Sequence, residues 1–242
     1  MTARRRAPLG LRPAPVPEGF PGRVSFIKSA SKLGEAPHHA LPEVCVAGRS
    51  NVGKSTLLNT LCNRRQLARA SSTPGRTRLI NFFNVQDRLA LVDRPGYGWA
   101  KAPASMRREW GRHIEGYLRD RPQLRLALLL VDIRHAPRPE DGQLLAWFRA
   151  VELPCLLVLT KADKVGSSRR AGRAKDIAGA LDFPVVDTVL FSAPERLGRD
   201  ALWGTILAGT AEEPAPPQGL STLPSSSDQE PVTRSRPRGG VS

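Results

Sequence analysis

The sequence of 242 residues predicts an α/β fold of the P-loop type, in which a mostly parallel six-stranded sheet carries helices on both faces. Strand-like and helix-like runs alternate between Glu43 and Gly209. Several strand-like runs are apolar throughout, which is typical of strands covered on both faces. A glycine-rich motif and two short polar motifs each follow such a run, and ligands of open α/β sheets bind at the carboxyl ends of strands.

The individual elements follow from apolar patterning and from the prolines that punctuate it. Strands are predicted at 43–47, 79–85, 88–92, 124–133, 155–160 and 185–191. Helices are predicted at 54–70, 103–121, 139–151, 167–181 and 195–209. Residues 23–210 therefore form the predicted folded domain. Residues 1–22, basic and proline-rich, and residues 211–242, rich in proline and serine, are expected to be disordered tails.

The composition excludes several classes of protein. A hydrophobic content of 40% excludes full disorder, and the longest apolar run, 126–131, falls short of the ~20 residues that span a membrane. Three widely spaced cysteines form neither a disulfide framework nor a zinc pattern, so we expect a cytoplasmic, reducing environment. The net charge of +15 lies mostly between the tails and favours a polyanionic partner such as nucleic acid. The alternative is an arginine-rich surface that is merely solvated.

The first motif has the G-x-x-x-x-G-K-[ST] pattern of a phosphate-binding loop and stands between a strand and a helix, as that motif requires. Its backbone N–H groups and the helix N-terminus would hold phosphates, its lysine would contact the β- and γ-phosphates, and its serine would bind Mg²⁺. The predicted nucleotide-binding residues here are Gly48, Arg49, Ser50, Asn51, Val52, Gly53, Lys54, Ser55 and the adjacent Thr56.

The second motif, Asp93-Arg94-Pro95-Gly96, follows a strand and has the D-x-x-G pattern. Its aspartate is expected to hold Mg²⁺ directly or through water, and its glycine N–H to approach a γ-phosphate. A polar loop at 71–78 lies between the two motifs, and a threonine there would close on the metal. Thr77 lies nearer the following strand than Thr73, although the residues alone leave both open. Gly75 and Arg76 accompany Thr77 in the predicted site.

The third motif, Thr160-Lys161-Ala162-Asp163, fits the [NT]-K-x-D pattern of guanine-nucleotide proteins. Its carboxylate can accept hydrogen bonds from guanine N1–H and the exocyclic amine, a pair of donors that adenine lacks. The lysine stem would lie against the base. A weaker motif, Phe191-Ser192-Ala193, ends the last predicted strand, and its backbone N–H groups are expected to reach guanine O6.

Together these motifs resemble the bacterial EngB family (also called YihA or YsxC) of translation-factor-related GTPases. The resemblance covers about residues 23–209 and rests on GRSNVGKS at 48–55, TPGRTRLIN at 73–81, DRPGYG at 93–98 and TKADK at 160–164. It implies a monomeric GTPase that binds GTP or GDP with Mg²⁺, assists assembly of the large ribosomal subunit through its rRNA, and has an indirect link to division septum formation. It also implies that Ser55 and Thr77 are the metal ligands.

Two positions depart from the family pattern. Arg94 stands where the family usually has leucine, so its charge is expected either to reach solvent or to perturb the switch. Glu195 follows Ser192-Ala193-Pro194 where a lysine or leucine is usual.

The catalytic residues implied by the motifs are Lys54, Thr77 and Asn51. Tyr97 occupies the place where small GTPases carry a water-orienting glutamine, so slow intrinsic hydrolysis is expected. In related GTPases an asparagine at the position of Asn51 helps to hold K⁺ beside the phosphates, which predicts stimulation by K⁺. The alternative role for Asn51 is a hydrogen bond that stabilises the loop.

Basic helical residues are the predicted RNA contacts, interleaved with Tyr97, Trp99 and Trp110, whose rings can stack on bases. Solvated arginines and a core Trp110 are the structural alternatives. Two competing functions stay open, a nucleotide-sensing scaffold with little catalysis and a P-loop kinase or ATPase. The arginines and the lysine in question are Arg107, Arg108, Arg112, Arg119, Arg121, Lys164, Arg169, Arg170 and Arg173.

Overall fold

The sheet and its covering helices are visible in a computed structural model that describes residues 12–64, 67, 79–94 and 116–211. The seven strands are β1 (Val24–Ala30), β2 (Glu43–Gly48), β3 (Ile80–Val85), β4 (Leu89–Asp93), β5 (Leu124–Asp132), β6 (Cys155–Thr160) and β7 (Thr188–Leu190). They lie in the order β1-β3-β4-β2-β5-β6-β7. Strands β2, β4, β5, β6 and β7 run parallel, whereas β3 pairs antiparallel with both β4 and β1.

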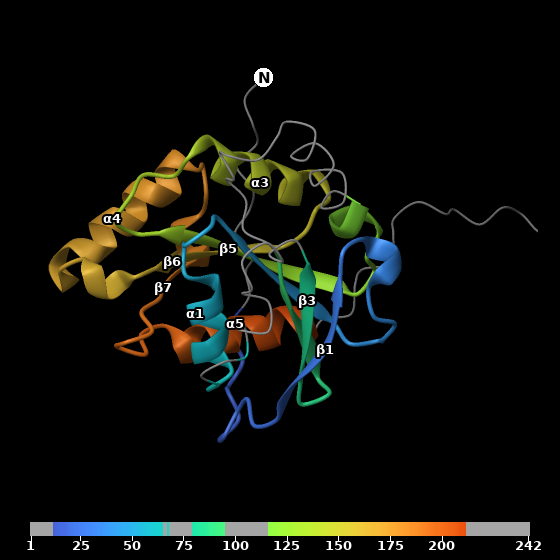
Figure 1. The fold of residues 1–242 in the computed structure, drawn as a ribbon. Helices are drawn as coiled ribbons and strands as arrows, with labels where there is room; N and C mark the ends of the chain where they lie inside the picture. The colour runs from blue at the N-terminus through green and yellow to red at the C-terminus, as the bar shows by residue number, and fades with distance from the viewer. Residues whose placement is uncertain (1–11, 65–66, 68–78, 95–115, 212–242) are drawn as a thin grey trace, which may run out of the picture. The chain divides into compact units, whose positions relative to one another are not determined.

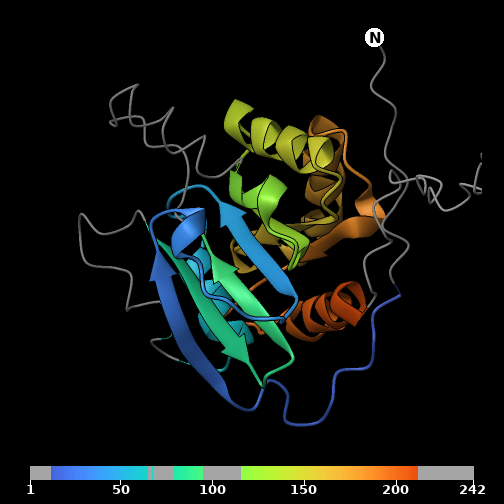
Figure 2. The same ribbon diagram turned by 90° about the vertical axis from the view of Figure 1, so that its right-hand side faces the viewer.

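Helices cover both faces of this sheet (Figures 1 and 2). Helices α1 (Lys54–Leu61) and α5 (Arg199–Ala211) pack on one face, and α3 (Pro139–Ala150) and α4 (Ser167–Ala180) pack on the other. Short 3₁₀ helices η1 (Leu33–Glu35), η3 (Ala162–Lys164) and η4 (Val185–Asp187) are also present, and residues 116–120 are helical. The strands alternate their buried apolar side chains between two hydrophobic clusters, one on each face.

The prediction of an α/β P-loop fold is confirmed, but the predicted number of strands is wrong by one. The additional strand is β1, which lies at the edge of the sheet; only its end residues Val24 and Ala30 are buried, and half-buried and exposed positions alternate between them. Its polar residues Ser25, Lys28 and Ser29 dilute the apolar signal that revealed the other strands. An edge strand needs only one buried face, so its sequence resembles a loop more than the central strands do.

Several predicted boundaries also shift for local reasons. The first helix ends at Leu61 rather than 70, and Asn63 then adopts a left-handed conformation. The last strand is shortened because residues 185–187 form η4 after Pro184. Helix α5 begins at Arg199 rather than 195, after Gly198 has turned the chain at φ +75°. Within 103–121, the described residues 116–120 are helical.

The expectation of a disordered arm through residue 22 is wrong for its later part, which packs on α5. Ala14 N–H donates to Gly204 O at 2.9 Å, and the buried Phe20 ring meets Trp203 edge-on with 4.7 Å between centroids. We call residues 12–22 the N-terminal strap.

None of the helices in the described part of the chain has the length and apolar character of a membrane span.

Candidate functional site

The phosphate-binding loop, residues 48–55, is built around two glycines that no other residue could replace without rearrangement. A Cβ on Gly48 would lie 2.9 Å from Leu130 O on the neighbouring strand, so the loop leaves β2 in close contact with β5. Gly53 has φ +109°, a conformation that only glycine adopts without strain, and it directly precedes α1. The first turn of α1 then presents Ser55 and Thr56 exposed at the helix N-terminus. The loop therefore has the geometry that phosphate binding requires.

Lys54 folds back over this loop. Its ammonium donates hydrogen bonds to Gly48 O and Arg49 O, each at 3.0 Å. Burial lowers its pKa to about 8, an effect that the nearby negative charge of Asp93 partly opposes. A bound polyanion would stabilise the charged form of this lysine, so the site is electrostatically prepared for phosphate.

Asp93 ends β4 next to β2, as the sequence predicts for a metal-binding carboxylate. Burial raises its pKa to about 6, whereas Lys54 and a hydrogen bond from Asn81 act in the opposite direction. Its Oδ1 atom is buried, and no group in the described residues donates a hydrogen bond to it. A buried carboxylate oxygen without a donor, beside the phosphate-binding lysine, fits Mg²⁺ coordination directly or through water.

Asn81 ends the stretch TPGRTRLIN on which the family resemblance partly rests, but the sequence predicts no role in the site for it. It lies opposite Asp93 in the β3–β4 ladder and is itself held by Ser29, whose hydroxyl donates to Asn81 Oδ1 at 2.6 Å. The signal available in the sequence was one of two asparagines, with Asn84, in a strand whose other residues are apolar. Its effect is to orient the aspartate carboxyl group.

The charged side chain of Arg94 is buried and does not reach solvent, although reaching solvent was one of the two expectations for this residue. Its exposed fraction is 2%, and the guanidinium lies 5.9 Å from the centroid of the Tyr117 ring. It also contacts the buried thiol of Cys45, whose pKa rises to about 11 through burial despite the positive charge nearby. Arg94 thus connects the metal motif to the helix that contains Tyr117.

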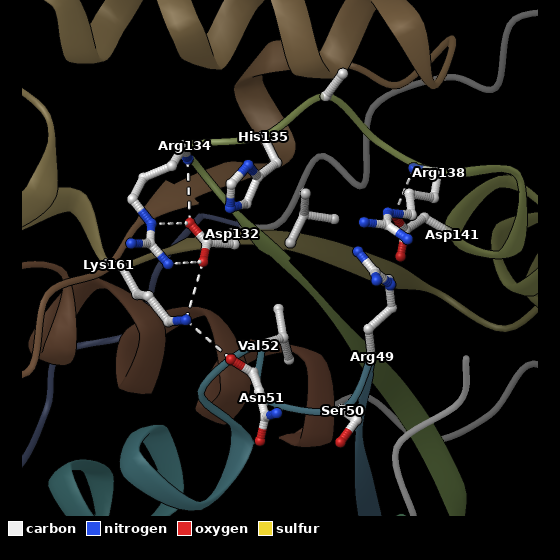
Figure 3. A pocket seen from close by; sticks show the side chains of 12 residues that line it. Arg49, Ser50, Asn51, Val52, Asp132, Arg134, His135, Arg138, Asp141 and Lys161 are labelled. Atoms are coloured by element: carbon white, nitrogen blue, oxygen red, sulfur yellow. Dashed lines mark hydrogen bonds and ion pairs between the residues drawn. The ribbon is translucent and has the colours of Figure 1, made fainter. Parts of the chain in front are cut away.

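The base motif is attached directly to the phosphate-binding loop. Thr160 Oγ1 donates to Val52 O at 2.7 Å. Lys161 Nζ donates to Asn51 O at 2.8 Å (Figure 3). Both motifs end parallel strands, β6 and β2, at the same edge of the sheet. Their contact brings together two segments separated by more than 100 residues.

Asp163 is an ionised carboxylate at this edge. Burial alone would raise its pKa, but the hydrogen bond from Ser192 Oγ (3.0 Å) and the ammonium of Lys164 (3.3 Å) leave the pKa below its usual value. An ionised carboxylate can accept two hydrogen bonds from guanine, as the motif predicts. Ser192 therefore acts through its side chain, a role that the sequence did not suggest.

Two backbone N–H groups of the last motif, Phe191-Ser192-Ala193, already donate hydrogen bonds within the protein. Phe191 N–H donates to Leu159 O, and Ser192 N–H donates to Leu197 O. Both groups are therefore unavailable to guanine O6, and the prediction is wrong for them. Ala193 N–H has no acceptor among the described residues and stays the candidate donor.

Asp132 is the second site residue that sequence reasoning missed. Its carboxylate pairs with Lys161 Nζ at 2.9 Å and Arg134 Nη2 at 2.8 Å, and it also accepts the backbone N–H of Arg134 at 3.1 Å. Burial would raise its pKa, but these partners hold it far below the usual value. Asp132 ends the apolar strand β5, so its position at a strand end was the available signal.

Other predicted residues fall outside the described ranges. In the nucleotide site these are Gly75, Arg76, Thr77, Pro95 and Gly96, and the alternatives Thr73 and Tyr97 lie there too. Among the predicted RNA contacts, Arg107, Arg108, Arg112, Trp99 and Trp110 also lie there.

Several described RNA candidates are committed to internal contacts instead. Arg170 forms a two-pronged ion pair with Glu195 at 2.8 Å, and Arg121 is buried against Glu43. Arg173 donates to Ile133 O at 3.2 Å. Arg119, by contrast, is exposed, and its 3.0 Å contact with the exposed Asp120 leaves it accessible from solvent.

Comparisons of the sequence with known proteins find a matching family model and several close relatives. The family model described as "50S ribosome-binding GTPase" matches residues 43–161. The "Probable GTP-binding protein EngB" of Geobacter sp. (strain M21) is 48% identical over 202 residues, which cover 79% of this chain and 94% of that protein. Its counterpart in Levilactobacillus brevis is 46% identical over 186 residues, 76% of this chain and 94% of that protein.

Solved structures agree on the fold. The crystal structure of a probable GTP-binding protein engB superposes with a TM-score of 0.60, at 23% identity, over 71% of this chain and 100% of that one. Era in complex with MgGDPNP and a 16S rRNA fragment gives a TM-score of 0.54, at 23% identity, over 76% of this chain and 61% of that one. The identities to the curated relatives, over nearly their whole length, identify the family: the chain is a member of the EngB family of P-loop GTP-binding proteins.

Proposed function

We propose that this protein is a slow GTPase switch that binds GTP and GDP with Mg²⁺ and assists assembly of the large ribosomal subunit in the cytoplasm. The proposal includes the family's indirect link to division septum formation. The observation that carries it is the direct bonding of the base motif to the phosphate loop, through Thr160 to Val52 and Lys161 to Asn51. One nucleotide can therefore contact both motifs at one edge of the sheet.

In this proposal each part of the edge has a separate task. The loop N–H groups and Lys54 bind phosphates, Asp163 and Ala193 select guanine, and Ser55 and Thr77 ligate the metal with Asp93 beside them. Mg²⁺, when bound, would neutralise charge that develops on the phosphates. The switch segments would order around the terminal phosphate and relax after hydrolysis.

Nucleotide binding is the first test. Labelled GDP should bind in the presence of Mg²⁺ and should be displaced by GTP but not by equal ATP. Asp163→Asn should lose the preference for guanine and gain xanthine nucleotides, because an amide nitrogen can donate to the additional carbonyl of xanthine. Displacement of GDP by ATP would support a kinase or ATPase instead, and an unchanged base preference in Asp163→Asn would remove Asp163 from the site.

The ribosomal partner requires its own experiment. The matching family description names 50S binding, and the net charge of +15 suits an RNA-rich particle. Co-sedimentation with large-subunit particles should depend on whether a GTP analogue, GDP or no nucleotide is supplied. Equal sedimentation in all three states would contradict a nucleotide-controlled switch.

Tyr97 favours a second candidate function, a nucleotide-sensing scaffold with little catalysis, because it replaces the usual water-orienting glutamine. Single-turnover phosphate release with and without large-subunit particles separates the two candidates. Acceleration by particles supports the GTPase switch, and no release in either condition supports the scaffold.

Asn51 carries the proposed K⁺ stimulation. Its side chain is exposed and, among the described residues, makes none of the loop-stabilising hydrogen bonds that were its alternative role. Its φ of +62° gives a separate reason for asparagine, which tolerates left-handed backbone. Turnover should be faster in K⁺ than in Na⁺ and should lose this difference in Asn51→Ala; equal rates in both salts would remove the idea.

A further inference from the structure

A polar pocket of about 220 Å³ lies beside the nucleotide site, between the phosphate loop, the segment after β5 and the first turn of α3. In Figure 3, Arg49 extends from the loop toward Arg138 and Asp141, while Asp132, Arg134 and Lys161 line the opposite side. Lys54, Ser55, Asp93, Asp163 and Ser192 are not among its lining residues. The pocket therefore shares residues 49–52 of the phosphate loop and Lys161 of the base motif with the predicted nucleotide site, but it is not lined by the phosphate-binding lysine, the metal carboxylate or the guanine-reading carboxylate.

The charges around this pocket are unbalanced. Four cationic side chains line it, those of Arg49, Arg134, Arg138 and Lys161, against the two carboxylates of Asp132 and Asp141. One of these carboxylates, Asp132, already forms ion pairs with two of the cations, Arg134 and Lys161.

The second carboxylate is occupied as well. Asp141 caps α3 by accepting the backbone N–H of Arg138 at 2.8 Å. In the described part of the chain, no carboxylate forms an ion pair with the guanidinium of Arg49 or Arg138.

The shortage of negatively charged partners in the pocket is visible at one atom of Arg49. Its Nε is buried, yet no described group accepts a hydrogen bond from it. A buried guanidinium donor without an acceptor costs free energy, and an anion in the pocket would remove that cost. The planar fork of arginine matches a phosphate in particular.

The solvent-exposed rim of the pocket also carries positively charged side chains. Arg134, His135 and Arg138 are all exposed, on the segment between β5 and α3. An extended polyanion could place one phosphate in the pocket and lie along this rim. A protein carboxylate would satisfy the deep arginine equally well, but a backbone of regularly spaced phosphates suits the whole rim better.

We infer that the pocket is a second anion site, which receives a backbone phosphate of the RNA partner next to the bound nucleotide. The inference rests on the proposed ribosomal function and adds to it the place of contact. It also gives the RNA a direct route to the nucleotide, because Arg49 belongs to the phosphate loop itself. The site consists of Arg49 at its base and Arg138 at its rim.

The decisive variant is Arg138→Gln, which removes a rim charge and preserves the backbone that forms the α3 cap. With labelled large-subunit rRNA in a filter-binding assay at saturating GTP analogue, its Kd should rise about five- to tenfold. The slope of log K against log salt should become shallower by about one, as expected for one lost phosphate contact. GDP affinity should stay unchanged.

Arg88→Gln is the matched control, since Arg88 is an exposed arginine in the turn before β4, at the opposite end of that strand from Asp93. It should change rRNA affinity less than twofold. Arg49→Gln should weaken rRNA binding like Arg138→Gln, and the double variant should lose less than the product of both effects, because both arginines hold one phosphate.

The outcomes separate the pocket from the proposed function. If Arg138→Gln matches Arg88→Gln, the pocket assignment is wrong even though the protein binds rRNA. If Arg138→Gln weakens binding to particles but not to naked rRNA, the pocket receives a protein and the RNA assignment is wrong. If the unaltered protein binds neither rRNA nor particles in any nucleotide state, the proposed function itself fails.

Discussion

Three aspartate carboxylates lie in the candidate site, and they differ in how strongly burial and hydrogen-bond or ion-pair partners shift their pKa values. Asp93 is buried with few partners and has a raised pKa, whereas Asp163 and Asp132 have partners that lower theirs. The same side-chain chemistry is thus prepared for a metal at one position and for stable ionisation at the other two. These differences arise from local partners, Arg134 and Lys164, together with contacts from distant segments, such as Lys161 with Asp132.

Asp132→Asn should destabilise the protein at pH 7, by roughly 1–3 kcal/mol, because Lys161 and Arg134 would lose their common carboxylate. The folded pKa of Asp132 is lowered, so its contribution is present above the unfolded value, near 3.8, and is lost as pH falls below it. Urea unfolding should therefore show a constant gap between the two proteins from pH 7 to about 5.5. The gap should narrow as the pH falls below about 4; a gap that widens on acidification would contradict the assigned role.

Two contacts between secondary-structure elements, which we call joints, hold the nucleotide-binding motifs together at the carboxyl ends of the strands. One is the bond from Thr160 in β6 to the phosphate loop, and the other is the turn before α5, which carries Ser192. In that turn Gly198 has φ +75°, and a Cβ there would lie only 2.0 Å from Leu190 O. The first contact links two motifs to each other, and the turn before α5 holds Ser192 of the last motif in place.

Thr160→Val keeps the shape of the side chain but removes its hydrogen bond to Val52 O. We expect a loss of about 1–2 kcal/mol in the free energy of unfolding, since a buried carbonyl loses its donor. Affinity for GDP and GTP should fall together, several-fold, without a change in base preference, measured by fluorescent-nucleotide titration. Thr160→Ser, which retains the hydroxyl, should restore most of the affinity; if it does not, packing rather than the hydrogen bond is responsible.

Gly198→Ala should destabilise the protein by at least ~2 kcal/mol, because the substitution forces both an unfavourable φ and a clash with backbone. Gly172→Ala is the contrasting change: Gly172 lies inside α4, and a Cβ there meets nothing within 4 Å. That variant should gain ~0.5–1 kcal/mol in chemical denaturation. Similar effects from both glycines would show that the turn before α5 is not the constrained joint.

The sequence predicted the central strands well because their apolar character comes from burial on both faces, as in β5 and β6. It predicted the motif residues because phosphate and guanine chemistry constrain short, contiguous patterns. It missed β1, whose edge position weakens its apolar signal, and it missed Asn81 and Asp132, whose roles depend on partners from other strands. Such pairings become visible only once the sheet order is known.

At the scale of the whole described domain, two hydrophobic clusters lie on opposite faces of the sheet, and one of them supports the phosphate-binding part of the site. The cluster under α1 and α5 supports the helix that begins with Lys54. Its periphery is fixed by Arg199, which donates to Leu61 O and Phe20 O, and by Trp203 Nε1, which donates to Leu61 O. The N-terminal strap, α5 and the end of α1 therefore meet at one point.

Phe20→Ala tests whether the N-terminal strap is a structural part of the domain. The Phe20 ring is 5% exposed and packs edge-on against Trp203, so its removal leaves a cavity between the strap and α5. We expect a loss of about 3 kcal/mol in urea unfolding. Phe26→Ala is the matched control, because Phe26 is 48% exposed on β1 and its loss should cost below ~1 kcal/mol. Equal losses would mean that the strap contributes no more than a surface side chain. A larger loss for Phe20→Ala, with GDP affinity retained at temperatures where the variant is folded, would show that the strap stabilises the fold without taking part in nucleotide binding.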